Sequence, residues 1–301
     1  GTKNNDGRIE EIVSWKAGFL SDFVVIADRT VCCGYNIFLP VVVFAECGIF
    51  AINFNCNMAN IIWVDEAGST NSVLADMSRQ GVACDGDVLA ARAQSAGRGQ
   101  RGNSWESEPG ANLTFSMLFS GRGYDVSRNF MVSEAVALAV ADVVAEEICG
   151  SGERVCVKWP NDIYVGDRKV CGILIENVLS GRTVERCIAG IGLNINQKQF
   201  VSDAPNPVSL FQIDGKERSV EDTLVRLTGR ILEYMEEVES LHSRYMSRLW
   251  RKDGFYPYDD NLRGERVEAR IADVLPEGQI VLELRNGECR EYAFKEVSAV
   301  L

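Results

Sequence analysis

The residues best suited to chemistry begin with a glycine-rich loop. Residues 97–102 read Gly-Arg-Gly-Gln-Arg-Gly, so their glycines match the pattern G-x-G-x-x-G. A dinucleotide site would need this loop to open a helix within a β-α-β unit. Instead, the segment 105–110, which contains Pro109, leads into a strand-like run, and we reject the dinucleotide interpretation. Backbone N–H groups and two guanidinium groups favour a loop that folds over an anion; a mobile surface loop is the alternative.

A second group of polar residues surrounds a break in a strand-like run. Residues 158–162 read Lys-Trp-Pro-Asn-Asp, and a proline inside a strand forces a break or an edge position. Asn161 and Asp162 at that break can present oxygen atoms to a ligand or to Mg²⁺. Lys169, at the base of the next run, would direct a cation to the same place. The alternative is a hairpin with a solvated, charged turn.

The third pattern is a strand interrupted by glycine. Residues 189–196 read Ala-Gly-Ile-Gly-Leu-Asn-Ile-Asn, which places Gly190 and Gly192 inside an apolar run. Glycine weakens a strand and often marks the close approach of a ligand. The alternative is a pair of strands packed too closely for side chains.

Composition excludes several classes of protein. The 301 residues are 46% apolar with a net charge of −12, which argues against a disordered chain and against a generic nucleic-acid coat. The ten cysteines include no Cys-x-x-Cys pair, and His242 is the only histidine. A zinc site, a Ser–His–Asp unit and a Cys–His unit are therefore disfavoured. Free thiols in a reducing cytoplasm are the favoured interpretation.

Three helices and seven strand-like runs must position these residues. One helix begins at Ser69 and ends at Gly81, and two long helices are expected at 127–148 and 219–250. The strand-like runs lie at 60–65, 87–94, 111–119, 154–159, 163–165, 170–177 and 183–196. Because strands and helices do not alternate regularly, the sequence predicts an α+β fold in which helices pack on one face of a mixed β-sheet.

Two segments flank this expected domain, 58–258. Residues 259–301 contain short runs at 265–274, 279–284 and 289–294 separated by turn residues, a pattern typical of a small β-barrel. Residues 1–57 differ from the rest. They hold an apolar run at 31–52 that is long enough for a membrane helix but is interrupted by polar residues and a proline.

We interpret residues 1–57 as sequence upstream of a natural start at Met58. A small apolar extension is the rival, and a membrane anchor comes third. The segment has no helix-turn-helix pattern. A chain of residues 58–301 is therefore expected to keep its activity.

The three patterns, together with Ser-Thr-Asn at 69–71, resemble biotin protein ligases, also called biotin–[acetyl-CoA-carboxylase] ligases. The resemblance spans residues 59–301. It implies a class II synthetase-like biotin/lipoate ligase fold with a C-terminal SH3-like β-barrel at 259–301. Longer family members carry a winged helix and act as repressors, and this chain resembles the monofunctional type.

The resemblance implies two half-reactions. The carboxylate of biotin attacks the α-phosphate of ATP to give biotinyl-5′-adenylate, and a lysine of a biotin carboxyl carrier protein then displaces AMP. Neither step needs a protein nucleophile. The implied substrates are biotin and ATP with Mg²⁺, with no tightly bound cofactor. The implied setting is cytoplasmic, without nucleic acid or membrane, and a homodimer is an open question.

The resemblance also implies roles for individual residues. By this resemblance, the catalytic residues are Lys169 and Arg98. Biotin binding falls to Ser69, Thr70, Asn71, Gln94, Gly97, Arg98, Gly99, Gln100, Lys169, Gly172, Gly190 and Gly192. ATP binding falls to Arg98, Arg101, Trp105, Asn161, Asp162, Lys169 and Asn194, with Asp162 as a Mg²⁺ ligand. Gln100 and Asn103 replace arginines of the family loop, which leaves retention of the adenylate open.

Two alternatives accompany this interpretation. A lipoate- or octanoate-transferring enzyme of the same superfamily would lack the C-terminal barrel and the 158–162 pattern. A DNA-binding biotin sensor is disfavoured by the acidic chain and by the lack of a basic helix.

Overall fold

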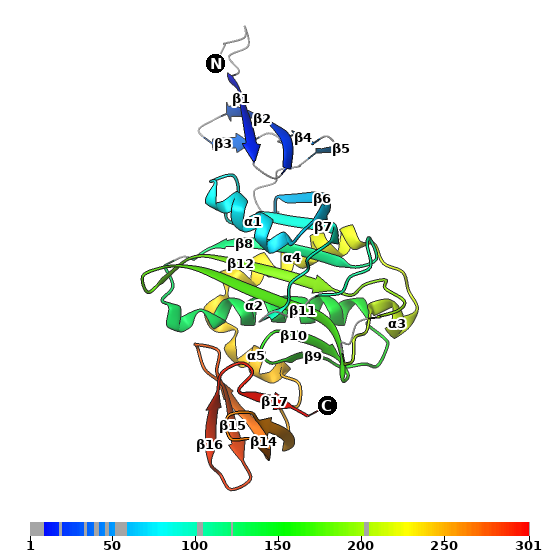
Figure 1. Cartoon of the computed structure of the whole chain (residues 1–301), viewed down its shortest axis with the longest axis vertical. Coiled ribbons are helices and arrows are strands. Elements are labelled where there is room, and N and C mark those ends of the chain that lie inside the picture. The colour runs from blue at the N-terminus through cyan, green and yellow to red at the C-terminus, as the bar shows by residue number, and fades with distance from the viewer. Residues whose placement is uncertain are drawn as a thin grey trace.

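The computed structural model describes residues 59–100, 105–121, 123–201 and 205–300 in full, and only the backbone of five strands nearer the N-terminus. Those strands are β1 (Ile9–Ala17), β2 (Leu20–Cys32), β3 (Tyr35–Phe38), β4 (Val42–Ala45) and β5 (Gly48–Ala51). They pair antiparallel in a sheet of their own, which lies at one end of the molecule (Figure 1). Within the apolar run 31–52, the described residues thus form strands where a helix was considered, and Met58 lies outside the described residues.

A seven-stranded mixed sheet forms the centre of the protein, as the sequence predicts. Its strands run in the order β6-β7-β8-β12-β11-β10-β9, with β6 and β7 parallel and all other neighbours antiparallel. The bounds are β6 Ile61–Ala67, β7 Val88–Gln94, β8 Leu113–Ser120, β9 Val155–Lys158, β10 Asp162–Val165, β11 Arg168–Ser180 and β12 Thr183–Leu193.

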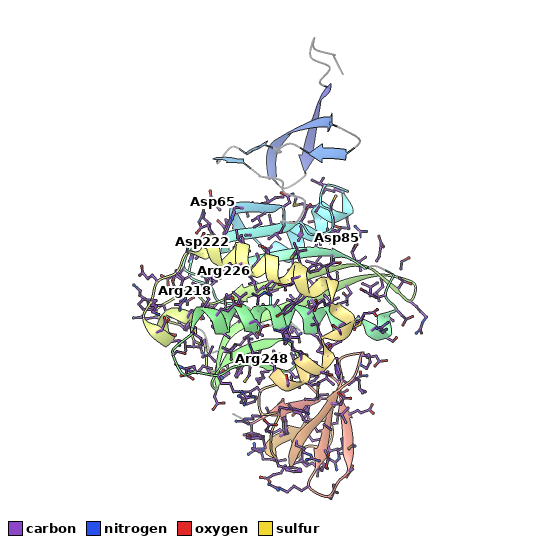
Figure 2. All side chains as sticks on the ribbon, turned by 180° about the vertical axis from the view of Figure 1, so that it is seen from behind. Asp65, Asp85, Arg218, Asp222, Arg226 and Arg248 are labelled. Atoms are coloured by element: carbon purple, nitrogen blue, oxygen red, sulfur yellow. The ribbon has the colours of Figure 1, made fainter. Side chains whose placement is uncertain are left out.

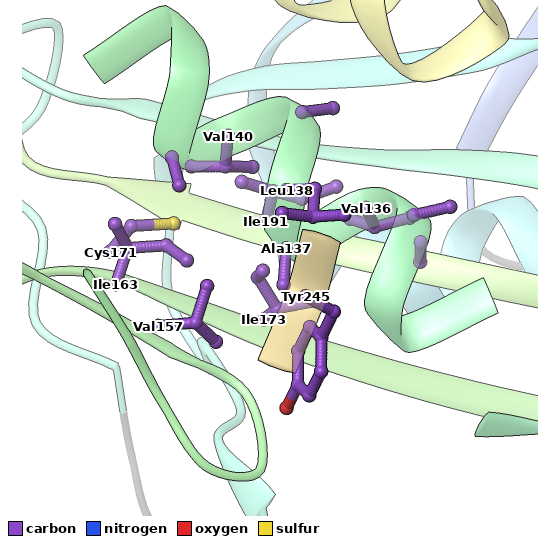
Figure 3. Packing of buried hydrophobic residues seen from close by; sticks show 14 of the residues in the cluster. Val136, Ala137, Leu138, Val140, Val157, Ile163, Cys171, Ile173, Ile191 and Tyr245 are labelled. Carbon is purple, nitrogen blue, oxygen red and sulfur yellow. The ribbon is translucent and has the colours of Figure 1, made fainter. Parts of the chain in front are cut away.

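One face of this sheet is covered by α2 (Phe130–Glu147), which follows the short 3-10 helix η2 (Val126–Arg128). Side chains of a strand alternate between faces, so every second residue of the inner strands reaches α2. Figure 3 shows this contact between α2 and the strands, formed by Val136, Ala137, Leu138, Val140, Val157, Ile163, Cys171, Ile173 and Ile191. The helix α4 (Val220–Glu236) lies outside α2 and buries one apolar stripe against it.

The opposite face carries α1 (Thr70–Arg79), so the prediction that helices pack on one face is wrong. Leu74 of α1 joins a separate apolar cluster with Leu89, Leu118 and Ile188 from the strands beneath. This helix is short and covers only part of its face. The rest of that face stays available for a site.

The expected helix 219–250 is broken in the structure. After α4, the 3-10 helix η3 (Val238–Ser240) turns the chain into α5 (His242–Arg248). The break lets Tyr245 of α5 reach the core, where its ring meets Phe130 edge-on at 5.8 Å. The helix α3 (Leu210–Asp214) was not predicted, although a capping box between Ser209 and Gln212 marks its start.

An ion-pair cluster joins the ends of these helices. The buried Arg218 guanidinium lies 3.0 Å from Glu147, the last residue of α2, and 2.7 Å from Asp214, the last residue of α3. Arg226 pairs with the same Glu147, and both arginines are seen beside α4 in Figure 2. The cluster fixes the helices behind the sheet.

The C-terminal β domain is a five-stranded antiparallel sheet with the order β16-β15-β14-β13-β17. Its strands are β13 (Tyr256–Asp260), β14 (Glu265–Val274), β15 (Ile280–Leu284), β16 (Cys289–Tyr292) and β17 (Val297–Ala299). The sheet therefore begins at Tyr256, ahead of the expected boundary at 259. The indole of Trp159 donates to the carbonyl of Gly278 at 3.0 Å and ties this domain to the central sheet. Within the described residues, no helix is both long and apolar enough to cross a membrane.

Candidate functional site

A row of residues crosses the open face of the central sheet. The strand register pairs Lys158 with Asp162, Asp162 with Gly172, Gly172 with Gly192, and Gly192 with Thr114. Directly paired residues project from the same face. The row therefore runs from polar Thr114, over a floor of two glycines, to two charged side chains, Asp162 on β10 and Lys158 on the edge strand β9.

A buried polar network lies at the Thr114 end, beside the start of α1. The backbone N–H of Thr70 donates to Gln94 Oε1 at 2.8 Å, and the Thr70 hydroxyl donates to the same atom at 3.3 Å. The Ser116 hydroxyl lies 2.7 Å from Thr70 Oγ1. Because Thr70 already bonds to the side-chain oxygen of Gln94, the group that Gln94 has left for a ligand is its NH₂ donor. Ser69 precedes the helix and forms no capping bond through its side chain.

Asn71 connects this network to the glycine strand. Its Nδ2 donates to Glu176 Oε2 at 2.8 Å, and its Oδ1 lies 2.5 Å from Ser116 Oγ. A Cβ atom on Gly190 would overlap the Asn71 amide oxygen. Gly190 is thus required for the position that Asn71 takes in this network.

Trp105 lies on the glycine floor. A Cβ atom on Gly172 would stand 2.9 Å from the indole ring, and one on Gly192 would overlap it. The indole Nε1 is buried and has no acceptor among the described residues. At the base of the glycine loop, the Trp105 N–H donates to the Gly97 carbonyl at 3.0 Å. This bond holds the first residue of the loop, Gly97, next to Trp105, the residue whose ring covers the floor.

Lys169 and Asp162 form the charged end of the site. The Lys169 ammonium lies 2.6 Å from Asp162 Oδ1 and 5.5 Å from the centroid of the Trp105 ring. Backbone bonds from Lys169 N to Asn206 O and from Val208 N to Lys169 O hold the start of β11 in place. Asn161 donates to the Ile173 carbonyl and so fixes the break before β10. The structure thus joins the 158–162 pattern to Lys169, as the sequence predicts.

Arg98 is held away from this charged end. Its guanidinium lies 3.0 Å from Glu176 Oε2, the atom that also accepts from Asn71. Glu176 is four residues along β11 from Gly172, or about 13 Å at the usual rise of a strand. In this structure the two residues assigned to catalysis, Arg98 and Lys169, are therefore not brought together.

The remaining predicted residues are spread around this centre. Gln100 lines a separate groove of about 300 Å³ with Asn161 and part of the C-terminal β domain. Asn194 is only 2% exposed, and its Nδ2 donates to the Val208 carbonyl at 3.1 Å. Its Oδ1 has no donor among the described residues. Gly99 lies in the described part of the loop, whereas Arg101 and Asn103 lie outside the described residues.

Groups typical of nucleophilic catalysis lie elsewhere. His242 is bonded to Glu134 of α2 at 2.8 Å and to Asp273 of β14 at 3.1 Å. Complete burial raises the pKa of the Cys171 thiol and keeps it protonated. Within the described residues, no three His, Cys, Asp or Glu side chains come together in a group that could hold a metal ion.

Two residues of the site were missed from the sequence. Ser116 alternates with apolar residues in β8, and that period of two places it on the face of Thr114. Glu176 is the last residue of the run 169–176 that follows the proline break, but no role was assigned to it, because its contact with Asn71 spans 105 residues of sequence. The alternation around Ser116 could have been recognised in the sequence, whereas the contact of Glu176 with Asn71 needed the tertiary structure.

The chain is similar to one family of known proteins. The model of the "Biotin/lipoate A/B protein ligase family" matches residues 65–194. The biotin–[acetyl-CoA-carboxylase] ligase of Mycobacterium tuberculosis is 31% identical over 189 residues, which cover 62% of this chain and 69% of that protein. The bifunctional ligase/repressor BirA of Escherichia coli is 34% identical over 194 residues, covering 62% of this chain and 57% of that protein.

The chain spans about half the length of these relatives, matching 47% of the BirA of Salmonella typhimurium and 57% of the BirA of Escherichia coli. Solved structures share the fold. The biotin protein ligase from Aquifex aeolicus in complex with biotin and ATP superposes with a TM-score of 0.65 at 24% identity, covering 79% of this chain and 97% of that chain. The chain belongs to the biotin/lipoate protein ligase family.

Proposed function

We propose that this chain is a biotin protein ligase, which activates biotin with ATP and transfers it to a lysine of a biotin carboxyl carrier protein. The observation that carries the proposal is the continuous row on the open face of the sheet. A polar network, an apolar floor of Gly172 and Gly192, and the Lys169–Asp162 pair follow one another there. This order matches the head group, apolar chain and carboxylate of biotin. The names of the relatives from Mycobacterium tuberculosis and Escherichia coli support it.

The polar network would bind the ureido ring. That ring offers one carbonyl acceptor and two N–H donors. The Gln94 amide provides a donor, because its oxygen is already engaged by Thr70. The hydroxyl groups of Ser69 and Thr70 lie at the same helix start. Since buried polar groups strongly favour a ligand that satisfies them, this end would select the head group.

The apolar chain of biotin would cross the glycine floor. The indole of Trp105 now lies on Gly172 and Gly192, so it has to lift before the chain can pass. Once lifted, the ring would cover the chain and exclude water from the reactive anhydride. Gly97 and Gly99, which precede Trp105 in the sequence, would give the backbone the freedom for this movement.

Lys169 would stabilise charge in the adenylation step. An oxygen of the biotin carboxylate bonds to the α-phosphorus of ATP, and the bond to the bridging oxygen of pyrophosphate breaks. Negative charge builds on the non-bridging oxygens during this displacement, and the Lys169 ammonium would neutralise it. The loop arginine Arg98 would move from Glu176 towards the adenylate when the loop closes. Asn194, with its unpaired Oδ1, would accept from the adenine amino group.

The second half-reaction uses the acceptor as the nucleophile. The neutral amine of a carrier lysine attacks the acyl carbon, and AMP leaves with the electron pair of the broken C–O bond. The chain then needs to orient the reactants and shield them from water. This agrees with the position of His242, which is bonded to Glu134 and Asp273.

Asp162 is compatible with Mg²⁺ delivered by the nucleotide. Proteins usually hold this ion through one or two carboxylates together with substrate phosphates. A single carboxylate beside the expected phosphate position fits that pattern, although Asp162 is paired with Lys169 in the structure. The ion would neutralise phosphate charge, and its assignment to Asp162 stays a prediction.

Biotin-dependent exchange between ATP and pyrophosphate tests this function. The full chain is incubated with biotin, lipoate or octanoate in separate reactions, because the family includes lipoate enzymes. We expect exchange only with biotin, and exchange only with lipoate or octanoate would overturn the proposal. Transfer to a biotin carrier domain is then followed by mass spectrometry.

The role of Lys169 is tested in the same system. We expect Lys169→Ala to lower the single-turnover rate of adenylate formation by roughly 10²–10³, the usual effect of removing a preorganised charge. Lys198→Ala is the control, because Lys198 forms an exposed ion pair with Glu217. A rate for Lys169→Ala within a few-fold of wild type would exclude Lys169 as the catalytic cation.

A further inference from the structure

Lys158, the last residue of β9, is a cation next to the Lys169–Asp162 pair. Its ammonium lies 5.4 Å from the centroid of the Tyr164 ring. Among the residues that the structure describes, no carboxylate forms an ion pair with it. Burial lowers the pKa of Lys158, and the nearby Asp162 carboxylate opposes that shift. An unpaired, half-buried cation is unexpected in a chain with a net charge of −12.

The charged end of the site therefore holds one more positive than negative group. Lys158 pairs directly with Asp162 across β9 and β10, which sets their Cβ atoms about 5 Å apart. The Asp162 carboxylate is already engaged by Lys169 at 2.6 Å. The cationic excess lies on the outer side of Asp162, away from the glycine floor.

A cavity opens beside this cation. It has a volume of about 200 Å³ and lies between Lys158, Trp159 and Trp250 on one side and Phe294, Lys295 and Ser298 of the C-terminal β domain on the other. The volume exceeds that of a water molecule several-fold. An anionic group larger than water can therefore reach Lys158 from this side.

We propose that Lys158 binds the diphosphate leaving group of the adenylation step, an inference that rests on the proposed function. Phosphoryl displacement places the attacking and leaving oxygens roughly in line. The biotin carboxylate reaches the α-phosphorus from the glycine floor, so the leaving group departs on the opposite side, across Asp162 towards β9. Lys158 is the residue that the sheet register places there.

The step balances in atoms and electrons. The carboxylate oxygen bonds to the α-phosphorus, and the bond from that phosphorus to the bridging oxygen breaks. The electron pair stays on the bridging oxygen, which leaves as part of pyrophosphate. The Lys158 ammonium stabilises this added negative charge as it forms and transfers no proton.

The reverse reaction tests the proposal directly. The full chain, residues 1–301, is loaded with chemically prepared biotinyl-5′-adenylate and mixed with pyrophosphate, and ATP formation is followed. Lys158→Met removes the charge but keeps the apolar stem beside Tyr164, whereas Lys158→Arg restores a cation. We expect Lys158→Met to raise the apparent KM for pyrophosphate by about tenfold or more. Lys158→Arg should stay within about threefold of wild type, because either cation can form a charge-assisted bond to phosphate.

Transfer from the same adenylate to a carrier domain provides the internal control, because pyrophosphate takes no part in it. We expect this rate to be unchanged in Lys158→Met, Lys158→Gln and the surface control Lys198→Ala. An unchanged KM for pyrophosphate, or an equal loss of transfer, would overturn the role of Lys158. Failure of the wild-type protein to form ATP from the adenylate would instead overturn the proposed function. Thermal unfolding of each variant separates loss of charge from loss of fold, with Lys158→Gln as the second neutral variant.

Discussion

Gly190→Ala is the substitution whose effect the structure defines most sharply. The new Cβ atom would overlap the amide oxygen of Asn71. Asn71 is only 3% exposed and is bonded to Glu176 at 2.8 Å and to Ser116 at 2.5 Å. The side chain therefore cannot shift without breaking both contacts.

The cost follows from those two contacts. A hydrogen bond to a charged group contributes about 1.5–3 kcal/mol and a neutral one about 1 kcal/mol. Because the Glu176 side chain is 40% exposed, the lower part of the first range applies. We expect Gly190→Ala to destabilise the protein by about 2–3 kcal/mol. For a domain of this size, that lowers Tm by roughly 5–10 °C.

Thermal unfolding and biotin calorimetry measure this effect. In an Asn71→Ala background, the Cβ atom at position 190 has room, so the same substitution should cost less than about 1 kcal/mol. Gly229→Ala is the control with the opposite sign. Gly229 lies within α4 with no atom near its would-be Cβ, and alanine there should stabilise by about 0.5–1 kcal/mol. If Gly190→Ala matched wild type in Tm and in biotin affinity, or cost the same in both backgrounds, the reasoning would be refuted.

Two further predictions concern Arg98 and His242. Arg98→Ala should release activated biotin into solution faster than wild type. Biotin affinity should change less than about threefold, since the partly exposed Arg98 pairs with Glu176 in the structure. Release no faster than wild type would contradict this role. Burial lowers the pKa of His242, but its bonds to Glu134 and Asp273 outweigh burial and raise it above 6.5. This stabilisation is fully present below pH 6.5 and is lost as the pH rises through the raised value. Wild type should therefore lose Tm relative to His242→Gln as the pH is raised above 6.5, and parallel Tm curves would exclude a titrating contact.

Much of the site could be predicted from the sequence because its signals are local. The helix start at Ser69, the glycines at 190 and 192, and the proline break before Asn161 each act within a few residues. The alternation of Thr114 and Ser116 in β8 has the same short range. Such patterns can be recognised without knowing the tertiary contacts. The strands of the central sheet, the first helix and the glycines of the row can therefore be predicted from the sequence.

The sequence could not predict the contacts that depend on strand register and helix packing. Glu176 joins Asn71 and Arg98 only because β11 pairs with β12 in one register, and a shift by one residue would turn Glu176 to the other face. The long helix breaks after Glu236 because Tyr245 then reaches the core beside Phe130. Local pattern thus determined which residues are available, whereas the pairing of distant strands decided which of them meet.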